Sequence, residues 1–297
     1  MQGSLNVAVY NLGSINADLF YQVPHLLAPG ETLASTKHSK GLGGKGANMS
    51  VAAARAAARV VHIGAVGEDA RWAVDRLLEY GVDTRNISEV SEPTGHAIIM
   101  VDALGENAIL LYPGANHALL ETHIASALAE ATEADTFVFQ NETSGQGIGA
   151  TLASSKGMRV VYAAAPFDPE AVQAVLPLLD MLVMNAVEAD QLTTAMGVDL
   201  VALPVRDIIV TLGEDGCRWL NTDLGTDQSF PAIPVTPVDT TGAGDTFTGF
   251  LIAGLDRGLP MEQAILLGQQ AGAIMVTRHG TADVIPDLKD VQDARLG

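Results

Sequence analysis

Residues 159–213, RVVYAAAPFDPEAVQAVLPLLDMLVMNAVEADQLTTAMGVDLVALPVRDIIVTLG, alternate short apolar runs with longer mixed ones. The apolar runs 159–165, 181–184 and 207–212 are each predicted to form a β-strand. Helices are predicted between them, and the helix over 186–196 is expected to end at Gly197. Strands that alternate with helices, and that are apolar along their whole length, are typical of a parallel sheet covered on both faces.

The same alternation extends toward the N-terminus. A helix is predicted over 46–59, a strand over 60–66 and an amphipathic helix over 69–80. The predicted fold is therefore an α/β fold, whose doubly wound, mostly parallel sheet is flanked by helices. Residues 1–11, 41–94 and 115–297 are expected to form this core.

Two segments, 12–40 and 95–114, break the alternation. The first has few helix signals and several strand-like stretches. The second, GHAIIMVDALGENAILLYPG, is predicted to form two strands around a turn at 104–106. Together they are expected to form a small antiparallel β-sheet beside the core, and a lid over a cleft and a dimer contact are both uses for such a sheet.

The charge balance and the cysteine count exclude several classes of protein. The 297 residues include 16 Lys and Arg against 35 Asp and Glu, a net charge of −19. Such a chain is unsuited to non-specific nucleic-acid binding or to docking on an anionic membrane. Cys217 is the single cysteine, which excludes an intrachain disulfide and a multi-cysteine metal site. With no apolar run near the ~18 residues of a membrane span and no leader-like N-terminus, we expect a cytoplasmic protein.

The segment 238–249, VDTTGAGDTFTG, carries the most specific chemical signal. Gly242, Ala243 and Gly244 are small residues that lead directly into a helix of apolar period. Their free N–H groups and the helix dipole would form an anion hole. Asp245 stands at the same helix start and would take a proton from a hydroxyl that attacks a phosphoryl group. The structural alternative is that Asp245 only caps the helix.

A second glycine cluster, GLGGKGAN, covers residues 41–48. It matches the dinucleotide pattern G-x-G-x-x-G, but the polar segment before it is not a buried strand, so an oxidoreductase is the weaker interpretation. Adjacent glycines let the backbone approach a ligand closely. Lys45 and Asn48 would then offer donors to hydroxyl groups, although a glycine turn that opens a helix explains the cluster equally well.

Polar or glycine-rich stretches also follow several predicted strands. They are 140–142 (QNE), 185–188 (NAVE), 211–216 (TLGEDG) and 239–245 (DTTGAGD). In open α/β sheets, ligands bind beyond the carboxyl ends of the strands. Asn185 and Glu188 could hold a hydrated Mg²⁺, but in isolation the favoured interpretation of this pair is a helix cap with a first-turn Glu.

In their order and spacing these motifs resemble the PfkB family of carbohydrate kinases, from Asn16 to Pro286. The matching motifs are NAD (16–18), PGET (29–32), GGKGAN (43–48), GAN (114–116), NxxE (185–188), TLG (211–213) and DTTGAGD (239–245). The resemblance implies an α/β core with a β-lid and ATP-dependent phosphorylation of a sugar's primary hydroxyl, with D-ribose to ribose 5-phosphate as the expected reaction. A kinase for a nucleoside, a deoxyribose or a keto-sugar acid stays an alternative, as does a non-catalytic sugar- or nucleotide-binding regulator.

The resemblance also implies roles for individual residues. Asp245 would be the base, and Gly242, Ala243 and Gly244 would form the anion hole. Sugar hydroxyls would be held by Asn16, Asp18, Gly44, Lys45, Asn48 and Glu142. The nucleotide site would be lined by Asn185, Thr211, Gly213, Gly216 and Gln269, with Glu188 acting on Mg²⁺ through water. A monovalent cation, usually K⁺, would bind at Asp239, Thr241, Met275, Arg278 and Gly280, and Val284 stands where the family carries a serine. The lid strands are expected to pair in a homodimer.

Overall fold

The structure is a computed structural model that describes residues 7–294. In this part of the chain the main sheet has nine strands, in the order β13-β12-β11-β10-β9-β8-β1-β4-β5. The strands from β11 to β5 are parallel to one another, and β12 is antiparallel to both of its neighbours, β11 and β13. The bounds are β1 (Val9–Leu12), β4 (Val60–Gly67), β5 (Asp83–Val90), β8 (Thr136–Gln140), β9 (Arg159–Ala163), β10 (Met181–Asn185), β11 (Asp207–Thr211), β12 (Cys217–Asn221) and β13 (Thr226–Phe230). The predicted mostly parallel sheet is confirmed.

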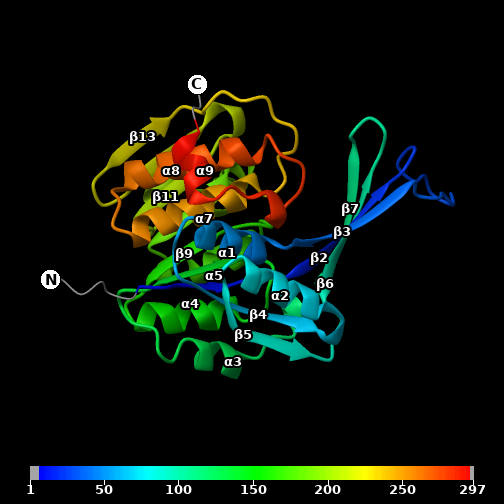
Figure 1. Cartoon of the computed structure of the whole chain (residues 1–297). Coiled ribbons are helices and arrows are strands. Elements are labelled where there is room, and N and C mark those ends of the chain that lie inside the picture. The colour runs from blue at the N-terminus through cyan, green and yellow to red at the C-terminus, as the bar shows by residue number, and fades with distance from the viewer. Residues whose placement is uncertain (1–6, 295–297) are drawn as a thin grey trace.

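Helices cover both faces of this sheet (Figure 1). One face packs against α1 (Lys45–Arg55), α2 (Arg71–Glu79), α7 (Ala243–Asp256), α8 (Met261–Met275) and α9 (Leu288–Asp293). The other packs against α3 (Glu121–Ala127), α4 (Gln146–Ser155), α5 (Pro169–Val175) and α6 (Ala186–Met196). Along β9, Val161 joins the first core whereas Val160 and Tyr162 join the second. This alternation of period two, with both faces apolar, is what a doubly covered strand requires.

A second, smaller sheet projects from one side of the core (Figure 1). Its strands are β2 (Asn16–Gln22), β3 (Lys37–Gly43), β6 (Gly95–Val101) and β7 (Asn107–Tyr112), in the order β3-β2-β6-β7. The predicted antiparallel pairing is found between β2 and β3 and between β6 and β7, whereas β2 and β6 pair in parallel. The chain passes through β3, α1, β4, α2 and β5 between β2 and β6, and this long crossover returns it in the same direction.

The boundaries of several elements differ from the predicted ones by a few residues. β3 continues to Gly43, past the predicted lid boundary at residue 40, because it pairs with β2 as far as Asn16. α1 ends at Arg55, not at residue 59, since Ala57 takes a positive φ of 67°. The helix over 186–196 and its end at Gly197 are confirmed. Short 3₁₀ helices occupy Glu68–Ala70, Gly114–His117, Leu176–Leu178, Leu200–Ala202, Gly213–Asp215 and Ala282–Val284. Within residues 7–294, the length and apolarity that a membrane crossing demands are met by none of the helices.

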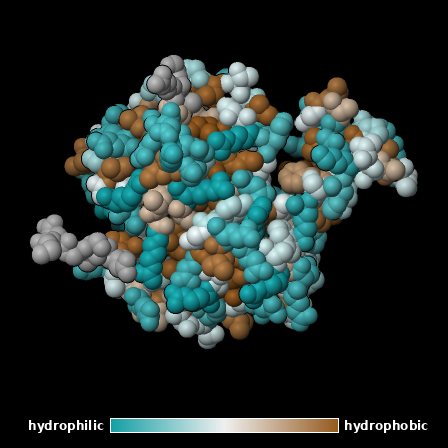
Figure 2. All heavy atoms as spheres, viewed as in Figure 1, coloured by the Kyte–Doolittle hydropathy of each residue, from teal (hydrophilic) through white to brown (hydrophobic). Residues whose placement is uncertain are grey.

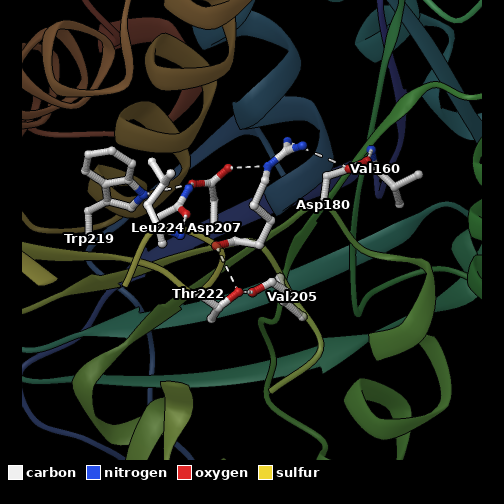
Figure 3. A network of polar contacts seen from close by, with 9 residues as sticks. Val160, Asp180, Val205, Asp207, Trp219, Thr222 and Leu224 are labelled. Carbon is white, nitrogen blue, oxygen red and sulfur yellow. Dashed lines mark hydrogen bonds and ion pairs between the residues drawn. The ribbon is translucent and has the colours of Figure 1, made fainter. Parts of the chain in front are cut away.

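A buried polar network lies at the amino-terminal end of β11 and contacts β12 (Figure 3). The Asp207 carboxylate, at the start of β11, accepts hydrogen bonds from Trp219 Nε1 at 2.9 Å and Asn221 Nδ2 at 2.8 Å. Arg206 Nε also donates to Asp207, at 3.0 Å. These bonds tie β11 to β12 at this amino-terminal edge. In open α/β sheets ligands bind at the opposite edge, beyond the carboxyl ends of the parallel strands.

Candidate active site

Asp245, the candidate base, lies in the first turn of α7. The N-cap of this helix is Gly242, which has a φ of +73° and no side chain that could cap the helix. Among the described residues, the N–H groups of Gly242, Gly244 and Asp245 donate no hydrogen bond, whereas the Ala243 N–H donates to the Thr240 carbonyl at 3.3 Å. The free donors and the helix dipole therefore form an anion-binding position. An anion bound there would face the N–H groups of Gly242, Gly244 and Asp245, whereas the predicted Ala243 N–H is engaged by Thr240.

The side chain of Asp245 is held by Asn48 on α1. Asn48 Nδ2 donates to Asp245 Oδ2 at 2.8 Å, so Asn48 orients the candidate base. Burial raises the pKa of Asp245 to about 6, although the nearby Lys45 ammonium and the Asn48 hydrogen bond lower it. A carboxylate with this pKa is ionised at neutral pH and is still a stronger base than an ordinary Asp.

Glu142, two residues after β8, holds the start of α1. Its Oε2 accepts the Lys45 backbone N–H at 3.0 Å and also the Ser14 hydroxyl. Its Oε1 lies 3.5 Å from Lys45 Nζ. Gly44, the N-cap of α1, has no side chain and a φ of +92°, so the Glu142 carboxylate takes the place of a capping side chain. Ser14 completes this arrangement and was not singled out from the sequence.

The Lys45 ammonium interacts with carboxylates of the predicted sugar-binding, catalytic and Mg²⁺-binding residues. Burial lowers the pKa of this ammonium, but the carboxylates of Glu142, Asp245 and Glu188 raise it above its ordinary value. Lys45 therefore keeps its positive charge in a group of acidic side chains. That charge is suitably placed to stabilise the negative charge on a transferring phosphoryl group.

The predicted sugar ligands Asn16 and Asp18 lie on β2 of the small sheet, next to glycines on the neighbouring strands. Asn16 Oδ1 accepts a hydrogen bond from Asn116 Nδ2 at 2.8 Å, and a Cβ at Gly95 of β6 would clash with both groups. A Cβ at Gly43 of β3 would clash with the Asp18 carboxyl group. The glycines thus make room for two buried polar side chains that point out of the sheet.

Asp18 is only 6% exposed. Burial and the nearby Glu142 carboxylate raise its pKa to about 7. The Thr281 hydroxyl lies 3.5 Å from Asp18 Oδ2 and donates to the Leu42 carbonyl at 2.8 Å. Thr281 was not predicted as a site residue, although it directly follows Gly280 of the candidate cation loop. Asn116 belongs to the quoted motif GAN, but no role was predicted for it.

The predicted nucleotide ligands lie at the ends of neighbouring strands. Asn185 ends β10 and is paired in register with Thr211, which ends β11. A Cβ at Gly216, whose φ is +100°, would clash with the Phe230 carbonyl. Gln269 on α8 donates to that same carbonyl at 3.2 Å. Gly216 and Gln269 therefore meet at the end of β13, and Gly213 lies between them and Thr211 in the chain, with a φ of +61°.

Asn185 and Glu188 form a capping box at the start of α6. Asn185 Oδ1 accepts the Glu188 N–H at 2.9 Å, and Glu188 Oε2 accepts the Asn185 N–H at 2.7 Å. The favoured structural interpretation of this motif is thereby confirmed. Glu188 Oε1 makes no hydrogen bond within residues 7–294 and remains able to bind a water of a hydrated Mg²⁺. Burial raises the pKa of Glu188, while the Asn185 N–H and the Lys45 charge lower it.

The described residues hold no group of three or more His, Cys, Asp or Glu side chains that could bind a metal. A Mg²⁺ ion would therefore take most of its ligands from water and from the phosphates of a nucleotide, which is its usual behaviour in phosphoryl-transfer sites. Glu188 fits that arrangement, because it is a single carboxylate at the carboxyl edge of the sheet.

The candidate cation loop is held together by Asp239. Its Oδ1 accepts the Thr241 N–H at 2.9 Å, and its Oδ2 accepts the Gly280 N–H at 3.2 Å. The Met275 carbonyl accepts the Arg278 N–H at 3.0 Å, and the Arg278 guanidinium donates to the Val284 carbonyl at 3.0 Å. The five predicted ligands therefore lie in two segments that Asp239 joins, and the Thr241 carbonyl accepts no hydrogen bond from the described residues.

Comparison with known proteins places this site in a family. Residues 7–288 match the pfkB family of carbohydrate kinases. A ribokinase from Haemophilus influenzae is 35% identical over 294 residues, which cover 94% of this chain and 95% of that one. The crystal structure of a ribokinase from Cryptococcus neoformans in complex with ADP superposes with a TM-score of 0.86 at 32% identity, covering 97% and 99% of the two chains. An Arabidopsis thaliana ribokinase complexed with ribose and ATP gives a TM-score of 0.82 at 26% identity, covering 96% and 97%.

The chain belongs to the pfkB family of carbohydrate kinases. It is a kinase that transfers a phosphoryl group to an alcohol, and its fold is the ribokinase-like α/β fold with a smaller sheet.

Proposed function

We propose that this chain transfers the γ-phosphoryl group of ATP to the primary hydroxyl of D-ribose, which gives ribose 5-phosphate and ADP. The observation that carries the proposal is the position of Asp245. Its carboxylate is fixed by Asn48 at the helix start where the N–H groups of Gly242 and Gly244 are free. Similarity to ribokinases along nearly the whole chain supports ribose as the sugar.

In this mechanism each residue group has one task. Asp245 accepts the proton of the sugar hydroxyl as the hydroxyl oxygen attacks the γ-phosphorus. The bond between that phosphorus and the bridging oxygen breaks, and ADP leaves with the electron pair. The free N–H groups at the start of α7, together with Lys45, stabilise the charge on the transferring group. Asn16, Asp18 and Glu142 hold the other sugar hydroxyls.

The nucleotide is expected to bind across the ends of β10, β11 and β13. Asn185, Thr211, Gly213, Gly216 and Gln269 would line that edge, and Glu188 would contact Mg²⁺ through water. Mg²⁺ would neutralise part of the triphosphate charge, which matters because Asp18, Glu142 and Asp245 already make this region acidic. A monovalent cation would bind beside the loop at Asp239 and Gly280 through backbone carbonyls, since Val284 offers no side-chain oxygen.

The direct test is sugar-dependent release of ADP from Mg·ATP. The purified protein is assayed with D-ribose, 2-deoxyribose, a nucleoside and a keto-sugar acid, each with KCl or NaCl as the salt. We expect the highest kcat/KM with D-ribose and a higher rate in KCl than in NaCl. A higher kcat/KM with another acceptor would reassign the substrate, and ATP bound without turnover of any acceptor would support a regulator instead.

The small sheet is also proposed to form a homodimer. Its two edges differ: β3 carries Lys37 and Lys40 on exposed positions, whereas β7 exposes four consecutive apolar side chains. These are Ile109, Leu110, Leu111 and Tyr112. Charged residues protect an edge strand from pairing, and their absence from β7 leaves that edge suited to pairing with a second copy. We place the reaction in the cytoplasm, in agreement with the buried free thiol of Cys217.

A further inference from the structure

Four polar side chains are buried together beneath the first turns of α1. Asn11, His62 and Gln140 lie on the adjacent strands β1, β4 and β8, and Ser50 lies on α1. All four are at most 1% exposed. On each strand, the residue two positions earlier is a valine of the core that packs against α1 and α7. Those valines are Val9, Val60 and Val138. Because strands alternate with period two, the three polar side chains face α1.

Asn11 is the centre of this network. Its Nδ2 donates to the Gly46 carbonyl at 2.8 Å and to Ser50 Oγ at 2.8 Å. Its Oδ1 accepts a hydrogen bond from Gln140 Nε2 at 2.8 Å. Both N–H groups and the oxygen of the Asn11 amide are therefore hydrogen-bonded within the protein.

His62 continues the network toward the end of β1. Its Nε2 lies 3.1 Å from the Gly13 carbonyl, and its Nδ1 lies 2.8 Å from Ser50 Oγ. A carbonyl can only accept, so Nε2 carries the hydrogen and Nδ1 accepts the Ser50 hydroxyl. Burial lowers the pKa of His62 to about 4, which keeps the ring neutral. One tautomer thus satisfies both ring nitrogens.

Apolar side chains of similar size would fill this part of the core without the cost of removing polar groups from water. Directional hydrogen bonds can fix the register of two backbone segments, which apolar packing cannot do here. A Cβ at Gly46 would clash with the Ser14 backbone N–H, and a Cβ at Gly13 would clash with the Gly46 Cα. The end of β1 and the start of α1 therefore meet backbone against backbone, with no side chains between them to fix their register.

The two backbone carbonyls that the network binds adjoin the site. Gly13 precedes Ser14, and Gly46 follows Lys45, and both Ser14 and Lys45 donate to Glu142. We propose that Asn11, Ser50 and His62, together with Gln140, are positioning residues that fix the Glu142–Lys45 pair and thereby set the affinity for the sugar. The role in sugar binding rests on the proposed function.

The first test removes three of the four network side chains at once and keeps Gln140. The triple variant Asn11→Val, Ser50→Ala, His62→Phe replaces the three by apolar side chains. Both members of the Asn11–Ser50 and Ser50–His62 bonds are removed together, but the Gly13 and Gly46 carbonyls and the Gln140 amide each lose a partner, so we expect a lower free energy of unfolding than in the wild type. The sugar KM should rise about fivefold or more, whereas the KM for ATP should change less than twofold. The single variant Ser50→Ala, which suits a helix, should raise the sugar KM about threefold.

A matched control comes from the network at the opposite edge of the sheet (Figure 3). Asn221 donates to Asp207 in a setting that is also buried and polar, with Asn221 7% and Asp207 4% exposed, and this setting lies at the amino-terminal end of β11, away from the site. Asn221→Leu should lower the free energy of unfolding and leave both KM values within a factor of two. Rescue is tested with His62→Gln, which keeps an N–H for the Gly13 carbonyl. The sugar KM of His62→Gln should be closer to the wild-type value than the sugar KM of His62→Leu.

A wild-type sugar KM in Ser50→Ala, or in the triple variant when it folds, overturns the proposal. A second readout needs no turnover: amide hydrogen exchange at residues 44–48 should be faster in Ser50→Ala than in the wild type and unchanged in Asn221→Leu. Unchanged exchange there also overturns the positioning role. Failure of the proposed function is a separate result, because it is the absence of sugar-dependent ADP release from the wild-type protein itself.

Discussion

Asp245 is the residue whose replacement tests the proposed chemistry most directly. Asp245→Asn keeps the size of the side chain and an oxygen that can accept the hydrogen bond from Asn48, but it cannot accept a proton from the sugar hydroxyl. We expect kcat to fall by about 10²–10⁴, the usual contribution of a general base. The KM for ATP should change little, because the N–H groups at the start of α7 are intact. Steady-state kinetics measure both, and an unchanged kcat would show that another group takes the proton.

The buried carboxyl of Asp18 links pH to stability as well as to binding. Its pKa of about 7 in the folded chain lies above the ordinary value of 3.8, so the folded state binds the proton more tightly than the unfolded state. The resulting stabilisation is complete below about pH 4 and is lost as the pH rises through about 7. Asp18→Asn should therefore raise the free energy of unfolding by roughly 1–3 kcal/mol at pH 8, and by much less at pH 5.

Urea unfolding at the two pH values measures this difference, and Asp223→Asn serves as the exposed control that should show none. A variant that is no more stable than the wild type at pH 8 would mean that Asp18 is accommodated as an anion.

Activity is expected to change with pH in the opposite direction to the stability that Asp18 contributes. Asp245, whose pKa is raised to about 6, must be ionised to act as a base. We expect kcat to rise with pH through about 6 for this reason.

At the scale of the element, the pairing of β2 with β3 makes the position of Asp18 testable through glycine. A Cβ at Gly43 would clash with the Asp18 carboxyl, whereas a Cβ at Gly41 on the same strand would make only an ordinary contact of 3.8 Å with Phe20. Gly43→Ala should raise the sugar KM at least tenfold and leave the KM for ATP within a factor of two. Gly41→Ala is the matched control and should change neither. Equal sugar KM values for the two variants would show that Asp18 does not bind the sugar.

The elements that the sequence predicted best are those with local signals. The predicted strand 181–184 and helix 186–196 carry an apolar run, a capping pair and a terminal glycine within a short window, and the structure has β10 at Met181–Asn185 and α6 at Ala186–Met196 with Gly197 after it. The parallel pairing of β2 with β6 was missed, because it depends on a crossover and not on either strand's own residues. The anion hole at the start of α7 stays a prediction, and the bond from Ala243 to Thr240 is a detail of the turn that no composition reveals.

Some residues of the candidate site have no local sequence signal and escaped prediction. Ser14, Asn116 and Thr281 act through contacts with residues far away in the chain: Glu142, Asn16 and Asp18. A single serine, asparagine or threonine has no spacing signal of its own, and each is as common in turns as in sites. The buried Asn11 and His62 do interrupt apolar strands, and such interruptions are the one local signal that could have indicated a network.

The whole molecule has a charge of −19, which opposes the approach of an anionic nucleotide. Screening limits this repulsion to about 8 Å at physiological salt, so the groups at the site determine binding. Lys45 and the free N–H groups of α7 are the positive potential that the chain itself supplies there. The same charge also keeps copies of the chain apart, and any association must therefore use an uncharged surface.

The proposed dimer would use the β7 edge of the small sheet, and Figure 2 shows that this sheet projects from the core, with hydrophobic residues at the outer end of the lobe. Leu110 is 65% exposed in the middle of this edge. Leu110→Glu places like charges opposite each other across a two-fold axis, and we expect it to convert a dimer into a monomer in light scattering. Leu224→Glu is the control, because Leu224 is 76% exposed on the β12–β13 hairpin of the core. If both variants and the wild type scatter as monomers, the lid sheet does not pair, and its exposed apolar edge then has a use other than dimerisation.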